Sequence, residues 1–436
     1  MSIERKIDDD YYFCKKDVCD CFKRVKQELR YSIFSHRWEG TEVTFRHFQM
    51  LEQEMAKADQ DAGEPKSRLD VLRGICEKLH SSSLSDSFSK LVHFLRASSK
   101  SRCRWAWADT ICIDKTSSAE TDECIRSMFN WYRNSYICIV FLAASRNSEE
   151  MEDDPWFTRG WTLQELLAPK RLAFYSSDWW QITSRDSEKQ PNELEDERQG
   201  EEEEADEDEE EEQEEKEEAE ERESDQLLWP HISKITGIDL EDLHNFKPGL
   251  DNLGKKLSWA SKRETTLLED LAYCLVGMLD INLSVAYGEK ERAFYRLQLK
   301  ILKNSDDLAL FDWQGKSSVY SSMLAGSPAC FLKPLGLHTD ASAIVSGDPT
   351  FTQTNVGIRI SLAVHQLDGA KVHSSWKLPG ATAFSILGAS PKSGYHIILI
   401  LSKFGNRNQQ YKRVALIEDK VNVAPYKKAP EVVFIK

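Results

Sequence analysis

The sequence predicts an α/β domain with a parallel sheet, followed by a small helical region and a C-terminal antiparallel β domain. Two observations lead to this prediction. In the first 185 residues, short apolar segments alternate with amphipathic helical patterns, which is typical of parallel strands joined by helices. Beyond residue 313, apolar and polar positions alternate instead, which is the pattern of strands with one buried face.

The α/β domain is expected to span residues 31–185, after a charged, helical lead-in at 1–30. Its four predicted strands are 31–35, 105–113, 136–142 and 171–175. Helical patterns precede and separate them, at 44–57, 66–80, 87–98, after the capping box Ser117-x-x-Glu120, and at 161–167. Because 105–113 is apolar on both faces, we expect a central strand, with Trp105 and Trp107 in the core.

The formal charge of −16 is concentrated in one segment. Residues 201–223 hold 18 acidic and two basic residues, so the rest of the chain balances at 55 of each sign. This balance argues against a nucleic-acid-binding protein. The segment 186–226 buries too little apolar area to fold, and we expect a disordered insertion there.

Two further regions follow the insertion. Residues 227–313 are predicted to be helical, with a capping box at Thr266-x-x-Glu269 and a helix at about 289–303. Residues 314–436 are predicted to form the β domain, with strands near 358–364, 396–401, 413–417 and 431–435.

The sequence also indicates the cellular compartment in which the protein is expected. No apolar run approaches the roughly 18–20 residues that cross a bilayer, and the first residues lack the apolar core of a signal peptide. A cytoplasmic protein without disulfides is therefore expected. Most of the ten cysteines, such as Cys112, Cys124, Cys138 and Cys274, lie in apolar patterns and are expected to be buried. The group at Cys14, Cys19 and Cys21 lacks a second pair at zinc-binding spacing, so no metal site is predicted.

Polar residues follow the predicted strands where a parallel sheet places its ligands. His36, Arg37 and Trp38 end the first strand, and Asp109 and Asp114 end the second. Arg159 and Trp161 precede the fourth strand. We expect these seven residues to line a cleft for a polar, planar ligand.

Several of these segments resemble the successive motifs of the fungal heterokaryon-incompatibility (HET) domain. They are YSIFSHRW at 31–38, WAWADTICIDK at 105–115, MFNWY at 128–132 and RGWTLQELLAP at 159–169. The stretch 257–298 is similar to the helical segment that often follows this domain. The sequence departs from the family pattern at Glu39, between Trp38 and Gly40, and at Lys115, where Gln is common.

The resemblance implies a role in fungal non-self recognition and programmed cell death. HET domains resemble TIR domains, which have a flavodoxin-like sheet and include enzymes that hydrolyse NAD. The segment Trp161-Thr162-Leu163-Gln164-Glu165-Leu166 is similar to the one that carries the TIR catalytic glutamate. It therefore implies Glu165 as the catalytic carboxylate, NAD as a substrate rather than a bound cofactor, and activation by self-association or by protein partners.

Each of these residues also has a structural interpretation. Glu165 suits the first turn of a helix, where the helix dipole favours a carboxylate. His36 could be bonded to a neighbouring loop, Asp109 and Asp114 could accept loop N–H groups, and Arg159 could pair with Asp153 or Asp154. A non-catalytic assembly module, or a C-terminal domain that senses a ligand, therefore stands beside the NAD hydrolase hypothesis.

Overall fold

The computed structural model describes most of the chain in two compact units. The described residues are 6–7, 11–12, 28–50, 52–53, 85–182, 228–336, 351–367, 374–391, 395–405, 409–421, 426 and 429–436. The first unit comprises Met1–Phe157 and Glu165–Phe246, and the second comprises Thr158–Gln164 and Lys247–Lys436. The predicted helix at 66–80, the acidic insertion at 186–226 and the cysteines 14, 19 and 21 lie outside the described residues. The predicted domain boundaries stay predictions.

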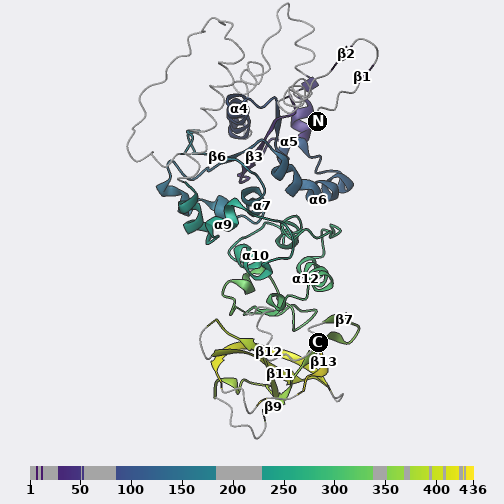
Figure 1. Cartoon of the computed structure of the whole chain (residues 1–436). Helices are drawn as coiled ribbons and strands as arrows, with labels where there is room; N and C mark the ends of the chain where they lie inside the picture. The colour runs from purple at the N-terminus through teal and green to yellow at the C-terminus, as the bar shows by residue number, and fades with distance from the viewer. Residues whose placement is uncertain are drawn as a thin grey trace, which may run out of the picture. The chain divides into compact units, whose positions relative to one another are not determined.

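The first unit is built on a four-stranded, wholly parallel sheet in the order β4-β3-β5-β6 (Figure 1). Its strands are β3 (Tyr31–His36), β4 (Trp105–Trp107), β5 (Ile137–Phe141) and β6 (Leu172–Tyr175). This order, with the first strand between the second and third, is that of the flavodoxin-like sheet. The predicted α/β class is therefore confirmed.

Helices cover both faces of this sheet. The helices and 3₁₀ turns of the unit are α4 (Ser85–Lys100), α5 (Asp109–Cys112), α6 (Ser118–Asn134), η1 (Glu149–Asp153), η2 (Pro155–Thr158), α7 (Thr162–Leu167) and α9 (Leu240–His244), with further helical residues at 45–50 and 228–236. Phe88, Leu91 and Phe94 of α4 pack against Phe34 of β3 and Ile139 of β5. On the other face, Tyr132 of α6 donates to the Phe34 carbonyl at 2.9 Å.

The start of α6 follows the predicted capping box in part. Ser117 Oγ accepts from the Glu120 N–H at 3.3 Å, as a helix cap does. The Glu120 carboxylate accepts from the Asp114 N–H at 2.9 Å, so it secures the preceding loop rather than Ser117.

The predicted strand 105–113 is wrong beyond Trp107. The chain turns at Ala108 into α5, and among the described strands β4 pairs only with β3, so it is an edge strand of the described sheet. Trp105 is 60% exposed, contrary to its predicted core position, and its indole donates to the Glu28 carbonyl at 3.0 Å. A short apolar run fits a strand and a buried helical turn equally well, and here its first part forms β4 and its second part forms α5.

Residues 6–7 and 11–12 pair as two short antiparallel strands, β1 (Lys6–Ile7) and β2 (Tyr11–Tyr12), where a helix was expected. Of the four cysteines predicted to be buried, Cys124, Cys138 and Cys274 are buried and Cys112 is half-buried. All four are free thiols.

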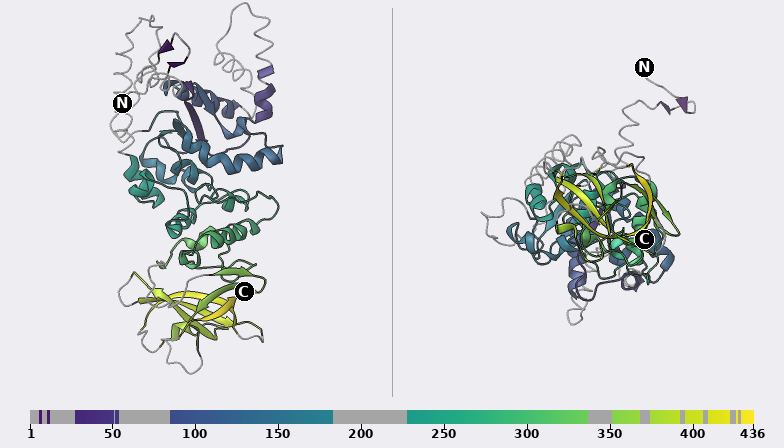
Figure 2. Two further views of the ribbon diagram at one scale, coloured as in Figure 1. Left: turned by 45° about the vertical axis from the view of Figure 1, so that its right-hand side comes forward. Right: turned by 90° about the horizontal axis from the view of Figure 1, so that it is seen from below.

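The second unit begins with helices and ends in a seven-stranded sheet (Figure 2). Its helical elements are α10 (Leu253–Ala260), α11 (Asp270–Tyr273), α12 (Arg292–Asn304), η3 (Leu308–Phe311), η4 (Pro328–Phe331) and η6 (Ser374–Trp376). Its strands are β7 (Thr352–Thr354), β8 (Gly357–Leu362), β9 (His365–Gln366), β10 (Ala383–Ala389), β11 (Tyr395–Lys403), β12 (Gln410–Lys420) and β13 (Glu431–Ile435). All strand pairs are antiparallel except β12 with β13, so the predicted C-terminal β class is confirmed.

The capping box predicted at Thr266 is wrong. The Glu269 carboxylate accepts from the Gly288 and Lys290 N–H groups at 2.7 and 2.9 Å, so it secures a loop instead of a helix start. The helix that follows is only the four-residue α11, and Leu268 is exposed rather than part of an apolar face. The helix predicted at 289–303 is confirmed as α12, with Phe294 on its buried face.

Candidate functional site

The strand order defines where a ligand is expected in the first unit. From β3 the chain runs outward to β4 and then returns past β3 to β5, so the connections diverge between β3 and β5. In open α/β sheets, ligands bind at the carboxyl ends of the strands at such a point. Here those ends are His36 of β3 and Phe141 of β5.

The alternation of side chains along β3 divides the candidate residues between two faces. Phe34 and His36 point to the α4 face, and their rings stack at 4.3 Å. Ser35 points to the α6 face and is fully buried. The first strand therefore supplies polar side chains to both faces of the sheet.

Glu165 lies on the Ser35 face, in a buried hydrogen-bonded chain. The indole Nε1 of Trp156 donates to Ser35 Oγ at 2.8 Å, and Ser35 Oγ donates to Glu165 Oε2 at 2.5 Å. Glu165 is only 7% exposed. The chain joins η2, β3 and α7, so it fixes the carboxylate one residue before the end of the central strand.

Together with burial, two of the predicted site residues, Glu165 and Asp109, raise the pKa of the same phenol, that of Tyr132. Burial raises the pKa of Tyr132 well above its usual range, and the charges of Glu165 and Asp109 raise it further. Burial and the charge of Glu165 likewise raise the pKa of the Cys138 thiol. Glu165 therefore acts electrostatically on both of these buried groups.

Lys115 supplies the opposite charge at this edge. Its Nζ lies 3.3 Å from the centroid of the Trp38 ring and 3.4 Å from Asp109 Oδ2. Burial lowers the pKa of Lys115, although Asp109 opposes that shift. One face of the Trp38 ring, a predicted stacking surface, is thus covered by an ammonium group.

Arg37 and Asp114 are loop residues that follow β3 and α5, and Arg37 is exposed whereas Asp114 is half-buried. Asp114 Oδ1 accepts from the Thr116 N–H at 2.9 Å and from Thr116 Oγ1 at 2.6 Å, and these bonds lower its pKa. Asp114 therefore makes the loop contacts that its structural interpretation predicts. Ligand contacts for both residues stay predictions.

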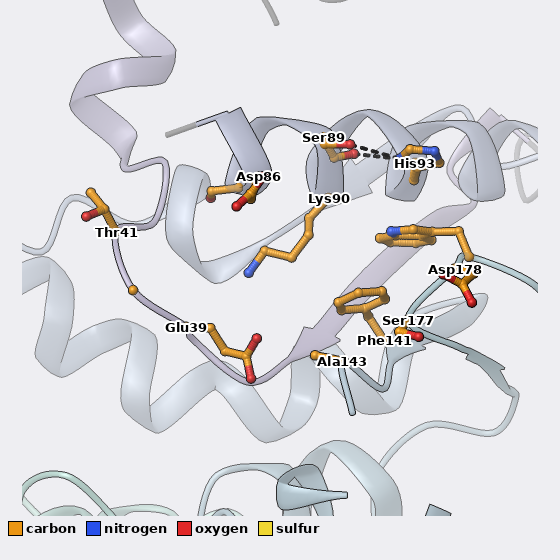
Figure 3. Close-up of a pocket in the computed structure, with 13 residues that line it drawn as sticks. Glu39, Thr41, Asp86, Ser89, Lys90, His93, Phe141, Ala143, Ser177 and Asp178 are labelled. Carbon is orange, nitrogen blue, oxygen red and sulfur yellow. Dashed lines mark hydrogen bonds between the residues drawn. The ribbon is translucent and has the colours of Figure 1, made fainter. Parts of the chain in front are cut away.

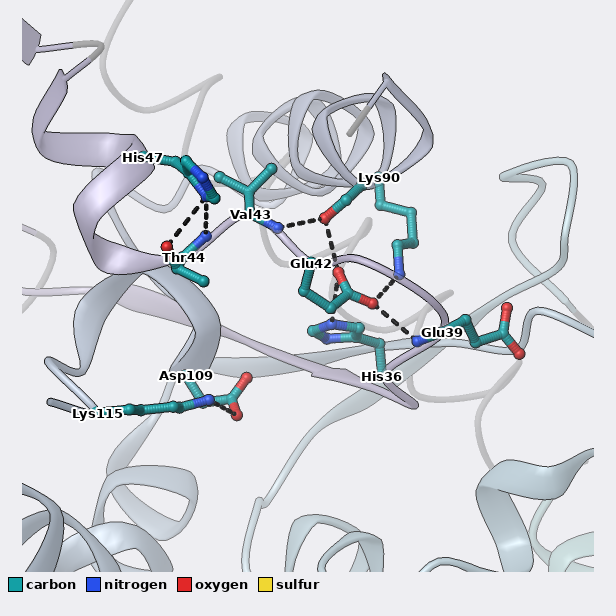
Figure 4. A network of polar contacts seen from close by, with 10 residues as sticks. His36, Glu39, Glu42, Val43, Thr44, His47, Lys90, Asp109 and Lys115 are labelled. Carbon is teal, nitrogen blue, oxygen red and sulfur yellow. Dashed lines mark hydrogen bonds and ion pairs between the residues drawn. The ribbon is translucent and has the colours of Figure 1, made fainter. Parts of the chain in front are cut away.

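On the α4 face, a network around Glu42 holds the loop that follows β3 (Figure 4). Glu42 Oε1 accepts from Lys90 Nζ at 2.6 Å, and Oε2 accepts from Ser87 Oγ at 2.6 Å and lies 3.8 Å from His36 Nε2. Burial alone would raise the pKa of the Glu42 carboxyl. The interaction with His36 and the hydrogen bonds from Lys90 and Ser87 outweigh burial and hold this pKa well below its usual range.

A cavity of about 520 Å³ opens beside this network, at the carboxyl ends of β3 and β5. In Figure 3, Lys90 extends into this cavity toward Glu39, with Phe141 on the opposite wall. Trp179 lines it too, stacked on Phe141 at 4.6 Å and on His93 at 5.3 Å, with a left-handed backbone at φ 63°. Glu165 and this cavity lie on opposite faces of β3.

Arg159 and Trp161 belong to the second unit. Arg159 Nη1 donates to Thr266 Oγ1 at 2.8 Å, in place of the Asp153 or Asp154 partner considered from sequence. Trp161 donates a hydrogen bond to Asp270, whose pKa is raised by burial against that bond. Their predicted ligand contacts stay predictions.

Sequence reasoning missed Glu42, Lys90 and Trp156. Glu42 and Lys90 lie in polar helical and loop patterns that resemble any solvated surface. The alternation of Ser35 and His36 along a strand already indicated that the two side chains point to opposite faces of the sheet, but no partner for Ser35 could be predicted. Among the described residues, no group of three His, Cys, Asp or Glu side chains is placed to hold a metal ion.

Comparison with known proteins identifies the first unit. The family model of the heterokaryon incompatibility protein (HET) matches residues 31–152. Residues 31–152 therefore match the HET domain. It is also 34% identical over 218 residues to vegetative incompatibility protein HET-E-1 of Podospora anserina.

That match covers 47% of this chain and 13% of HET-E-1. No solved structure matches significantly. The HET match includes Ser35 and Asp109, and Glu165 lies beyond it. None of the helices in the described ranges has the length and apolar character needed to cross a membrane.

Proposed function

We propose that this chain acts in heterokaryon incompatibility, and that its HET domain hydrolyses NAD during non-self recognition and the programmed cell death that follows. The similarity to a vegetative incompatibility protein supports the biological role. One observation supports the chemistry. A buried carboxylate, Glu165, is fixed at the carboxyl end of the central strand by Ser35.

The reaction breaks the bond between nicotinamide and ribose. Nicotinamide leaves as a neutral base, water adds to the anomeric carbon, and one proton is released, giving ADP-ribose. The transition state resembles an oxocarbenium ion, as in glycoside hydrolysis. A carboxylate in a site of low dielectric stabilises that positive charge more strongly than it would in water.

Other residues at the same edge suit the rest of the substrate. The Lys115 ammonium and the Arg37 guanidinium carry the charge that a pyrophosphate needs. The Trp38 ring offers a stacking face for nicotinamide or adenine once Lys115 moves off it to a phosphate. Asp109, which pairs with Lys115, would accept from a ribose hydroxyl in this proposal.

A second candidate function is a non-catalytic assembly module that triggers cell death through protein partners. The edge strand β4 supports it, because an edge strand offers unpaired backbone groups and Trp105 adds an exposed ring. In this case Ser35, Trp156 and Glu165 only hold the fold together.

Expression of the full chain in a fungal host separates the two functions. Cellular NAD and cell viability are followed for the wild type, Glu165→Gln and Glu165→Ala. The exposed Glu123→Gln on α6 is the control for the same charge change. The hydrolase proposal expects NAD loss and death together, both abolished by the Glu165 variants only. Death with unchanged NAD would establish the assembly module instead.

A further inference from the structure

A second cavity, of about 180 Å³, lies in the second unit between the segment after η3 and strand β12. It is lined by Trp313, Gln314, Gly315, Ser317, Ser322, Arg413, Val414, Ala415 and Leu416. Arg413 is the one charged residue in this lining. No carboxylate lines the cavity, so the one charged side chain in its lining is positive.

The hydrogen bonds of Arg413 are made to uncharged groups. Its Nη1 donates to the Phe311 carbonyl at 2.7 Å, and its Nη2 donates to the Trp313 carbonyl at 2.5 Å. The guanidinium carbon lies 3.6 Å from the centroid of the Trp313 ring. Within the described residues, no carboxylate lies within ion-pairing distance of this group. Carbonyl oxygens and a ring face provide dipoles but no counter-charge.

Burial makes this arrangement costly. Arg413 is only 8% exposed, and a buried charge without a partner is strongly disfavoured. Burial lowers the pKa of Arg413 to about 9, although the field of Asp312 opposes that shift. Asp312 accepts hydrogen bonds from the Leu335 and Gly336 N–H groups, which direct its carboxylate to that loop.

We propose that this cavity is an oxyanion-binding site, in which Arg413 receives a phosphate or carboxylate group of a ligand. A guanidinium group has five N–H donors in a planar fork that matches both groups, and only two are engaged by carbonyls here. Ser317 and Gln314 line the same cavity with a hydroxyl and an amide that can donate to the ligand. The site is independent of the chemistry proposed for Glu165, and it would give the C-terminal region a ligand to sense.

The test is a thermal-unfolding titration of the full chain with sodium phosphate or sodium acetate, at constant ionic strength set with sodium chloride. We expect a saturable rise in Tm of about 3 °C when the anion reaches ten times its dissociation constant. A rise with phosphate assigns a phosphate ligand, and a rise with acetate assigns a carboxylate ligand.

Two variants distinguish the site from general salt effects. Ser317→Asp places a carboxylate in the cavity, so this variant should have a raised Tm without added anion and no saturable response. Ser318→Asp adds the same charge one residue away, outside the lining, and should respond as the wild type does. The proposal is overturned if wild type shows no saturable rise, or if Ser317→Asp responds as strongly as wild type.

Discussion

Replacing Ser35 with alanine tests the buried chain that fixes Glu165. The substitution removes the acceptor of the Trp156 indole N–H and the donor to Glu165 Oε2. Both remaining groups are buried, and each unsatisfied buried group costs about 1–3 kcal/mol, with charged groups at the upper end. We therefore expect Ser35→Ala to lower the free energy of unfolding of the HET domain by about 3 kcal/mol.

Ser32→Ala is a matched control on the same strand. Ser32 is also fully buried, and its hydroxyl donates to Ser98 Oγ at 2.6 Å. Ser98 Oγ keeps its own bond to the Phe94 carbonyl after the change, and no charged group is left unpaired. The expected loss is therefore about 1 kcal/mol or less.

Thermal unfolding followed by tryptophan fluorescence measures the difference. At about 2–4 °C per kcal/mol for a unit of this size, Ser35→Ala should lower Tm by about 6–12 °C. In a Trp156→Phe background the indole donor is already absent, so Ser35→Ala should cost less there. Equal losses for Ser35→Ala and Ser32→Ala would refute the argument that Ser35 holds a buried carboxylate.

Three further predictions concern other parts of the chain. Glu42→Gln should destabilise the HET domain by about 2 kcal/mol at pH 7, because Lys90 loses a charged acceptor. The folded-state pKa of Glu42 is depressed, so the stability that Glu42 contributes should be present above about pH 4.5 and be lost as the pH falls below it. Measuring the free energy of unfolding across this pH range checks the prediction. Gly160→Ala places a Cβ 2.4 Å from Thr265 Cγ2, so chemical denaturation should show a loss of about 1–3 kcal/mol, and an unchanged midpoint would contradict that close approach. Trp105→Ala should cost less than about 1 kcal/mol by the same measurement, against at least about 3 kcal/mol for Trp156→Ala, because only Trp156 is buried; equal costs would show that Trp105 is packed.

The order of the strands and helices followed from the sequence because their apolar patterns are long and regular. The strand β5, the helix α6 and the helix α12 are close to their predicted ranges for this reason. The segment 105–113 failed because its apolar residues fit an edge strand and a helical turn together. The capping box at Thr266 failed because Glu269 finds its N–H partners in a loop almost twenty residues away, which no local pattern encodes.

The candidate site was predicted in composition but not in geometry. The sequence placed polar residues at the strand ends, and the structure has His36, Trp38 and Asp109 there. It could not show which side chains Ser35 and His36, on opposite faces of one strand, would contact in two separate networks. Arg413 was not singled out, because a lone arginine in a strand pattern resembles a surface residue until its packing against Trp313 is known.

The rate of nicotinamide release by the purified full chain, compared between wild type and Glu165→Gln, shows whether Glu165 is catalytic. Glutamine keeps an oxygen that accepts from Ser35, so both proteins should unfold at closely similar temperatures. We predict that wild type releases nicotinamide from NAD and that Glu165→Gln does so at least about 100-fold more slowly. Equal rates in the two proteins, or no release by wild type even when it is induced to self-associate, would contradict a catalytic role for Glu165.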